Sequence, residues 1–126
     1  MPRDIVSAPE DAASSAYYSA ATKAGGFVFV SGQGPWDPRR GAFAGTTIEE
    51  QADLTLKCLE RVLHEAGCSL ADVVKVQVHL RDLDDFDRFN QVYARYFPAP
   101  APARTTVGSQ LGEIMIEIDA IASAGA

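Results

Sequence analysis

With 126 residues the chain suits one domain, and we expect residues 1–126 to form a single unit with its own hydrophobic core. Hydrophobic residues make up 47% and charged residues 22% of the sequence, which excludes an intrinsically disordered chain. The formal net charge of -6 at pH 7 argues against nucleic acid as the main partner, because nucleic-acid binders present a basic surface.

The sequence gives little support for a membrane protein, a secreted protein or a metal-binding protein. The longest apolar run, residues 27–30, is far shorter than the roughly twenty residues that cross a bilayer. The start of the chain lacks the apolar segment of a secretory signal, so we expect a cytosolic protein that does not contact membranes. Two cysteines, Cys58 and Cys68, are expected to stay reduced. Because His64 and His79 are far apart in the sequence, we expect no metal site.

The first third of the chain predicts a hairpin. Residues 1–13 are polar and rich in alanine and proline, and we expect them to lie on the surface without regular structure. Residues 15–22 are expected to form a first strand, followed by a tight turn over residues 23–26 and a return strand over residues 27–33. The turn formers of residues 34–41 predict a loop or a short outer hairpin.

A long amphipathic helix and an alternating strand come next. Thr47 and Glu50 match a capping box, apolar residues then recur at helical spacing, and Gly67 suits the left-handed stop. From residue 74 to residue 80 apolar and polar residues alternate with the period of a half-buried strand. His79 is therefore expected to point away from its neighbours in that strand.

The last third predicts a second helix and two strands. Acidic residues 82–85 offer helix caps, a stripe of apolar and aromatic residues extends from Phe86 to Phe97, and Pro98 ends the helix. Strands are expected at residues 103–109 and 113–123. The order of elements predicts two helices on one face of a mixed sheet. The other face would mix apolar side chains with carboxylates, which suits a subunit interface with polar clefts.

Two charged residues of these last strands are the candidate catalytic pair. Arg104 follows Pro102-Ala103, and Glu117 comes thirteen residues later. An arginine at a strand end can bind a small carboxylate through two parallel hydrogen bonds, and a nearby glutamate can direct a proton or a water. Taken alone, Arg104 is most often a surface or salt-bridging residue, and Glu117 could face solvent or pair with a lysine.

Several stretches together give the sequence a family resemblance. It resembles the RidA/YjgF family of small enamine/imine deaminases over about residues 17–122. The matching stretches are Tyr18-Ser19, residues 29–33, Asp37-Pro38 with Gly41, residues 48–51, Ala66-Gly67 with residues 72–75, residues 89–93 with Tyr96-Phe97, Pro102-Ala103-Arg104, and Glu117-Ile118 with residues 120–122. They occur in the family's order.

The resemblance implies an α+β fold of the chorismate-mutase-like type, a homotrimer and three clefts between neighbouring subunits. It implies hydrolysis of 2-imino acids and their 2-enamino tautomers to 2-oxo acids and ammonia, without a cofactor. Carried over by position, Arg104 would bind the substrate carboxylate and Glu117 would orient or activate water. The backbone around Thr105 and Thr106 would contact the imine nitrogen. The pocket would be lined by Tyr18, Ser31, Gly32 and Asn90.

Each of these lining residues could instead have a purely structural role. Tyr18 could belong to the core, the amide of Asn90 could bond to backbone, and Ser31 and Gly32 end a strand, where Gly32 would let a backbone or a ligand approach closely. Free imines of small amino acids also hydrolyse in water, so the enzyme need only hold the carboxylate, place a water and ease proton transfer.

The sequence departs from the family pattern in three places. Ala16-Tyr17 replaces the usual Gly-Pro, and Ala20 replaces a glutamine. Thr106 stands where many deaminating members have a cysteine, and the connection from Arg104 to Glu117 is about two residues shorter. One alternative is therefore a pathway-specific deaminase of a longer enamine such as 2-aminomuconate. A second is a non-catalytic trimeric module that binds small carboxylates. The ribonuclease activity attributed to some relatives fits poorly with an acidic chain that lacks a catalytic histidine pair.

Overall fold

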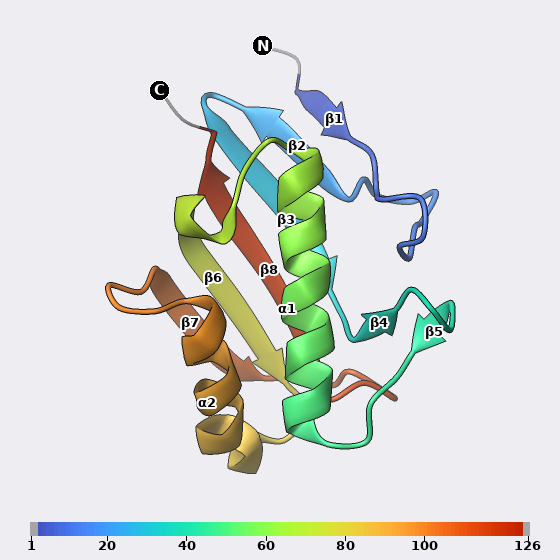
Figure 1. The fold of residues 1–126 in the computed structure, drawn as a ribbon, viewed down its shortest axis with the longest axis vertical. Coiled ribbons are helices and arrows are strands. Elements are labelled where there is room, and N and C mark those ends of the chain that lie inside the picture. Colours follow the sequence, from blue (N-terminus) through green and yellow to red (C-terminus); the bar gives the residue numbers. More distant parts are fainter. Residues whose placement is uncertain (1–2, 125–126) are drawn as a thin grey trace.

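The computed structural model describes residues 3–124, which form a six-stranded mixed sheet, two helices and an outer hairpin. Across the sheet the strands are β1 (Asp4–Val6), β2 (Ala21–Ala24), β3 (Phe27–Gln33), β8 (Ile116–Ser123), β6 (Val73–Leu80) and β7 (Ala103–Gly108). Only β6 and β7 pair in parallel. The outer hairpin consists of β4 (Trp36–Asp37) and β5 (Ala42–Phe43), as predicted for this region (Figure 1).

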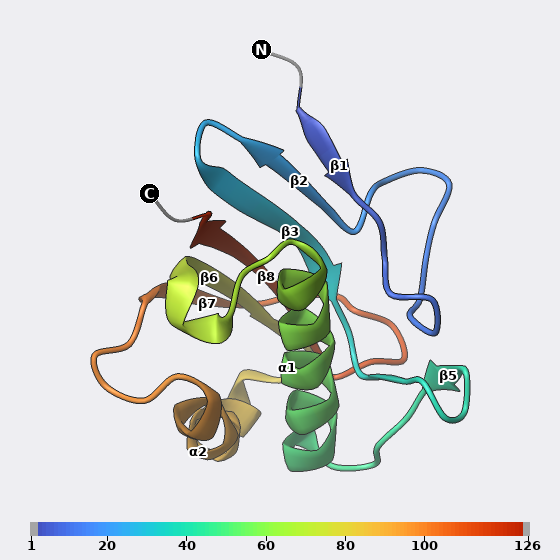
Figure 2. The ribbon, with the colours of Figure 1, turned by 45° about the horizontal axis from the view of Figure 1, so that its top comes forward.

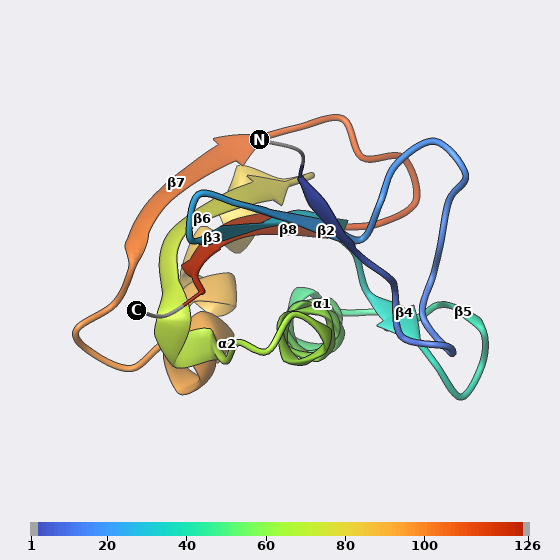
Figure 3. The same cartoon turned by 90° about the horizontal axis from the view of Figure 1, so that it is seen from above.

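Both helices, α1 (Ile48–Glu65) and α2 (Phe86–Tyr96), pack against the same face of the sheet (Figure 3). Short 3-10 turns, Leu70–Asp72 and Leu83–Asp85, precede β6 and α2. Helix α1 connects β3 to β6 and helix α2 connects β6 to β7, and these three strands run in the same direction. Successive crossovers of one hand in one direction place their helices on one face. The predicted arrangement is confirmed, and we call the other side of the sheet the open face.

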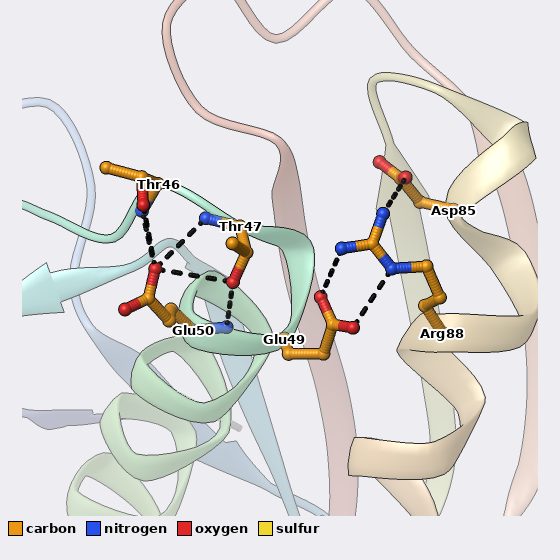
Figure 4. A network of polar contacts seen from close by, with 6 residues as sticks. All are labelled: Thr46, Thr47, Glu49, Glu50, Asp85 and Arg88. Carbon is orange, nitrogen blue, oxygen red and sulfur yellow. Dashed lines mark hydrogen bonds and ion pairs between the residues drawn. The ribbon is translucent and has the colours of Figure 1, made fainter.

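The start of α1 forms the predicted capping box. The backbone N–H of Glu50 donates to Thr47 Oγ1 at 3.2 Å, and the Glu50 carboxylate accepts from the backbone N–H of Thr47 at 3.1 Å (Figure 4). The hydrogen bonds from Thr46 and Thr47 lower the pKa of Glu50. Gly67, with φ of 78°, follows the helix end as predicted.

A bidentate ion pair joins the start of α1 to α2. Arg88 donates from Nε to Glu49 Oε2 at 2.9 Å and from Nη2 to Glu49 Oε1 at 2.6 Å, and it also lies near Asp85 (Figure 4). Both partners are exposed, so the pair adds little to stability. Two parallel hydrogen bonds thus link the first turn of α1 to the first turn of α2.

The core lies between the helices and the sheet. Strand β8 contributes to this core through alternate residues. Ile116 and Ile118 are fully buried, while Glu117 and Asp119 project to the open face. This alternation follows the predicted pattern. The largest fully buried side chains are Phe89, Ile48, Leu56, Leu59, Leu63, Leu80, Ile116, Ile118, Val28, Val62, Val76 and Val78. Each contributes about 1.5–3 kcal/mol through burial.

The N-terminal region differs from the prediction. Asp4–Val6 form β1 and pair with β2, and Val6 is buried in the core, whereas no regular structure was expected there. The first strand of the predicted hairpin, β2, covers Ala21–Ala24 and not residues 15–22. The Gly25-Gly26 turn pairs Ala21 with Val30, and a register shift in β3 follows between Val30 and Gln33. That shift lies in the pairing of β3 with β8, whereas the β2–β3 ladder begins only at Ala21, so the residues directly before Ala21 lie outside the sheet.

The strand that carries Glu117 begins later than expected. Strand β8 starts at Ile116, three residues after the predicted start. Gly112 turns the chain with φ of 69°, and the backbone N–H of Met115 donates to Gln51 Oε1 of α1 at 2.8 Å. The backbone N–H of Met115 is therefore bonded to the Gln51 side chain and not to a neighbouring strand, and β8 begins one residue later.

Candidate active site

Arg104 lies on the edge strand β7 and points toward helix α2. In the register of the sheet it is opposite Val76, a residue of the helix-covered face. Its guanidinium carbon lies 4.6 Å from the ring centre of Tyr93, 5.3 Å from Phe89 and 5.5 Å from Phe86. These rings recur on one face of α2 and hold the guanidinium by cation–π contacts of about 0.5–2 kcal/mol each. The apolar stripe predicted for this helix did not indicate this role.

Buried polar atoms without partners gather beside Arg104. Among residues 3–124, Asn90 Oδ1, the Tyr93 hydroxyl and Thr106 Oγ1 are buried and accept or donate no hydrogen bond. Asn90 follows Phe86 by one helical turn, and Thr106 follows Arg104 by two residues on the same side of β7. Burial raises the pKa of Tyr93, and the nearby Arg104 charge opposes this rise. We call Arg104, Asn90, Thr106 and the three rings the arginine cluster.

The arginine cluster is suited to bind an anion. Arg104 forms no ion pair with any residue of the described part of the chain, so the salt-bridge role does not account for it. Asn90 likewise makes no hydrogen bond to the described backbone through Oδ1. Each buried polar atom left unpaired costs about 1–3 kcal/mol, and the Tyr93 and Thr106 hydroxyls could donate to a bound anion, whereas Asn90 Oδ1 accepts and would pair with an N–H donor. Thr105 lies outside this cluster, because its Oγ1 accepts from Lys75 Nζ at 2.8 Å on the exposed side.

Glu117 lies in a second region, next to Gly32. A Cβ atom on Gly32 would stand 2.7 Å from Glu117 Cδ, so only glycine lets the carboxylate occupy this position. The close approach expected at Gly32 is thus made by a side chain. Both residues line a cavity of about 320 Å³ together with Tyr18, Trp36 and Arg61. We call this space the glutamate cavity.

The N-terminal segment closes the glutamate cavity on one side. Residues 5–9 and 12–15 line it, and Tyr18 to Ala20 continue its wall. In Figure 2 this segment passes beside β3, next to the β4–β5 hairpin. Ser31 is fixed close by, because its hydroxyl donates to the carbonyl of Ser19 at 2.6 Å. Ser31 and Tyr18 also line a shallow groove on the outer side of the same segment.

The side chains of Arg104 and Glu117 project from opposite faces of the sheet within one chain. Strand β6 lies between β7 and β8, and there Arg104 is opposite Val76 while Glu117 is opposite His79. Val76 and His79 lie on different faces of the sheet. The structure therefore brings Arg104, Asn90 and Thr106 together, and separately brings Tyr18, Gly32 and Glu117 together. The cavity that Glu117 lines does not include Arg104.

The open face carries apolar side chains and a chain of polar contacts. Phe27, Phe29, Val74 and Val107 are each between 42% and 45% exposed there. His79 Nδ1 lies 2.8 Å from Ser109 Oγ, and His79 Nε2 lies 3.7 Å from Asp119 Oδ2. Burial raises the pKa of Asp119, and His79 opposes that rise. The His79–Asp119 separation is too long for a hydrogen bond, so these groups do not form an oriented catalytic triad.

The cysteines are free, as expected, and buried. Cys58 lines the glutamate cavity, but its thiol donates to the carbonyl of Trp36 and burial raises its pKa to about 11. It is therefore a neutral thiol near pH 7 and a poor nucleophile. Within residues 3–124, no three His, Cys, Asp or Glu side chains are placed to hold a metal ion together. No helix of that range has the length and apolarity of a membrane span.

Comparison with known proteins identifies the family. The family model described as Endoribonuclease L-PSP matches residues 8–124, almost the whole chain. The chain belongs to the RidA/YjgF/L-PSP family. Among Rid-family relatives, a RutC family protein of Pyrococcus abyssi is 47% identical over 107 residues, which cover 83% of this chain and 84% of that protein. The Arabidopsis thaliana protein named Reactive Intermediate Deaminase A, chloroplastic, is 38% identical over 123 residues, covering 96% of this chain and 66% of that protein.

Solved structures of the Rid family share the fold. The crystal structure of the YjgF gene product of E. coli matches with a TM-score of 0.85 and 30% identity, covering 95% of this chain and 98% of that one. The α+β architecture with its mixed six-stranded sheet and two helices is therefore that of the family.

Proposed function

We propose that this Rid-family protein hydrolyses reactive 2-imino acids and their 2-enamino tautomers to 2-oxo acids and ammonia. The observation that carries the proposal is the arginine cluster, where an unpaired guanidinium is held among buried polar atoms that lack partners. Such a site fits the carboxylate of a small acid, because guanidinium is a permanent cation with a planar pair of donors. The name of the Arabidopsis relative, a reactive intermediate deaminase, agrees with this class of reaction.

A complete site requires a second copy of the chain. Since Arg104 and Glu117 project from opposite faces of one sheet, each chain supplies two incomplete regions. In the proposed homotrimer, the arginine cluster of one subunit lies against the glutamate cavity of its neighbour, so that three clefts form between subunits. The exposed phenylalanine and valine side chains of the open face support such an assembly, because association removes them from water.

In this cleft the reaction has three steps. Arg104 binds the carboxylate and so fixes the imine carbon, while Tyr18 and Asn90 flank the substrate. Glu117 accepts a proton from a water molecule as the water oxygen bonds to the carbon of the protonated imine, whose carbon–nitrogen double bond becomes single. Glu117 then returns this proton to the nitrogen of the resulting carbinolamine, the carbon–nitrogen bond breaks, and the hydroxyl proton passes to the departing ammonia as the carbon–oxygen double bond forms. Holding the reactants together and easing these proton transfers account for the acceleration.

The reaction is a hydrolysis without net oxidation or reduction, so the proposal includes no cofactor. Thr106 cannot serve as a thiol nucleophile, and its role is to shape the arginine cluster, with the backbone of Thr105 and Thr106 near the imine nitrogen. Ser31 and Gly32 shape the opposite wall, where Gly32 leaves room for Glu117. The cytosolic location expected from the sequence stays a prediction.

Replacing Arg104 tests the proposed function. We expect R104A to lower kcat/KM for ammonia release by about a thousandfold, because the substrate loses a charge-assisted bidentate contact. The 2-imino acid can be generated in the assay by an amino-acid oxidase, and circular dichroism verifies that the variant folds. Unchanged turnover would refute the assignment. If the wild type binds a 2-oxo acid through Arg104, detected as a higher Tm, yet hydrolyses no imine above background, the chain is a carboxylate-binding module.

A further inference from the structure

The glutamate cavity contains a second arginine that the proposed reaction does not use. Arg61, on α1, lines the same cavity as Glu117, Gly32 and Tyr18. Its side chain is 31% exposed, and its Nη2 donates to Asp11 in the N-terminal segment. A cation in this cavity is unexpected for the smallest 2-imino acids, whose only charged oxygen atoms would be bound by Arg104.

Arg61 keeps donors that no described residue uses. Its Nη1 is buried and has no hydrogen-bond partner within residues 3–124. A guanidinium offers five donors in a fixed plane, and Asp11 accepts from only one of its two terminal nitrogens. An unpaired buried donor on a charged group is costly, so the fork is suited to a second anionic partner.

The remaining wall of the cavity combines serines and Gln33 with an apolar part. Val62, Trp36 and Phe43 line it, and Cys58 contributes a neutral thiol. A volume of about 320 Å³ is at the small end of ligand pockets and suits a short carbon chain. An apolar wall section beside one cation suits a short hydrocarbon segment that ends in an acidic group.

We propose that Arg61 binds a second acidic group of the substrate, so that the enzyme prefers 2-imino dicarboxylic acids. This inference depends on the proposed function. Arg104 of a neighbouring subunit would hold the carboxylate beside the imine, Glu117 would serve the imine carbon, and Arg61 would hold the far carboxylate. Arg61 is then a specificity-determining residue and takes no part in proton transfer.

A purely structural role for Arg61 makes a different prediction. The residue could only fasten the N-terminal segment, which Trp36 Nε1 also holds through the carbonyl of Asp11 at 3.0 Å. In that case D11N, which removes the ion pair but keeps the cation, would have the same effect as R61Q. If Arg61 binds substrate, D11N leaves the preference for dicarboxylates intact, since the guanidinium keeps its charge.

The test compares two imines and two 2-oxo acids. An oxidase generates the imine of glutamate or of 2-aminobutanoate, and calorimetry measures binding of 2-oxoglutarate and 2-oxobutanoate. We expect R61Q to lower the dicarboxylate-to-monocarboxylate ratio of kcat/KM, and of affinity, by at least about tenfold, the usual effect of losing a hydrogen bond to a charged group. R61K should keep part of the preference for dicarboxylates. K57Q, which removes an exposed cation one turn earlier on α1, should leave it unchanged.

The outcomes separate this inference from the proposed function. If both imines are hydrolysed but R61Q lowers both rates equally, or D11N matches R61Q, the role of Arg61 is overturned and the deaminase remains. If neither imine is hydrolysed, the proposed function fails, and the binding data decide alone. Selective loss of 2-oxoglutarate affinity in R61Q would then support Arg61 as the anion site, and equal affinities would refute it.

Discussion

The arginine cluster and the glutamate cavity hold their charged groups in different ways. Arg104 rests against three aromatic rings at the sheet edge, where neighbouring polar atoms lack partners. Glu117 projects from a central strand into a space that exists because Gly32 has no side chain. One region offers unused hydrogen-bonding capacity, and the other offers volume. Neither region alone contains both charged groups, which is why we propose that the reaction takes place between two subunits.

The largest expected effect tests whether the two regions act across a subunit boundary. R104A and E117Q should each be inactive alone, because each lacks one essential group. When the variants are unfolded, mixed in equal amounts and refolded together, an intact Arg104 meets an intact Glu117 in about a quarter of the clefts. Ammonia release should therefore recover to about a quarter of the wild-type rate. If sedimentation shows mixed assemblies but no activity returns, the site lies within one chain.

A smaller effect is expected from filling the space beside Glu117. In G32A the new Cβ would lie 2.7 Å from Glu117 Cδ and force the carboxylate to move. A displacement of about 1 Å can lower kcat about a hundredfold. G108A is the matched control on β7, because its Cβ would meet Leu83 at an ordinary 3.4 Å. If G32A and G108A both keep full activity, the position of the Glu117 carboxylate is not critical for catalysis.

The smallest effect concerns the unpaired hydroxyl of the arginine cluster. Y93F removes a buried group that has no partner among the described residues, so the free energy of unfolding should stay within about 1 kcal/mol of the wild type or rise. If that hydroxyl contacts the bound substrate, KM should rise about tenfold with little change in kcat. Denaturant unfolding and steady-state kinetics measure the two effects. A loss of stability without a change in KM would show that Tyr93 belongs to the core alone.

Much of the fold was predictable because its signals are local. The capping box at Thr47 and Glu50, the left-handed Gly67 and the alternation around Glu117 each depend on residues close together in the sequence. The short strand β1 was missed because three residues carry no recognisable period. The predicted strand over residues 15–22 was wrong for all but its last two residues, since only Ala21 and Thr22 pair with β3, and pairing with a distant strand is not marked in the sequence.

The candidate site was predictable only in part. The sequence resemblance selected Arg104, Glu117 and their neighbours, and the family comparison confirms that family. It gave no sign that aromatic residues of α2 would hold Arg104, although their spacing at Phe86, Phe89 and Tyr93 could have suggested a common face. Arg61 was missed because nothing near it in the sequence marks a cavity.

Residue types and their spacing determined both helices, the longer strands and the side of the sheet that their residues face, because these depend on backbone periodicity and short-range hydrogen bonds. Tertiary structure alone decided that Arg104 and Glu117 point away from each other and that Arg61 shares a cavity with Glu117. Those relations depend on strand order and on how helices cross the sheet, which bring together residues distant in the chain and separate residues that the sequence places side by side.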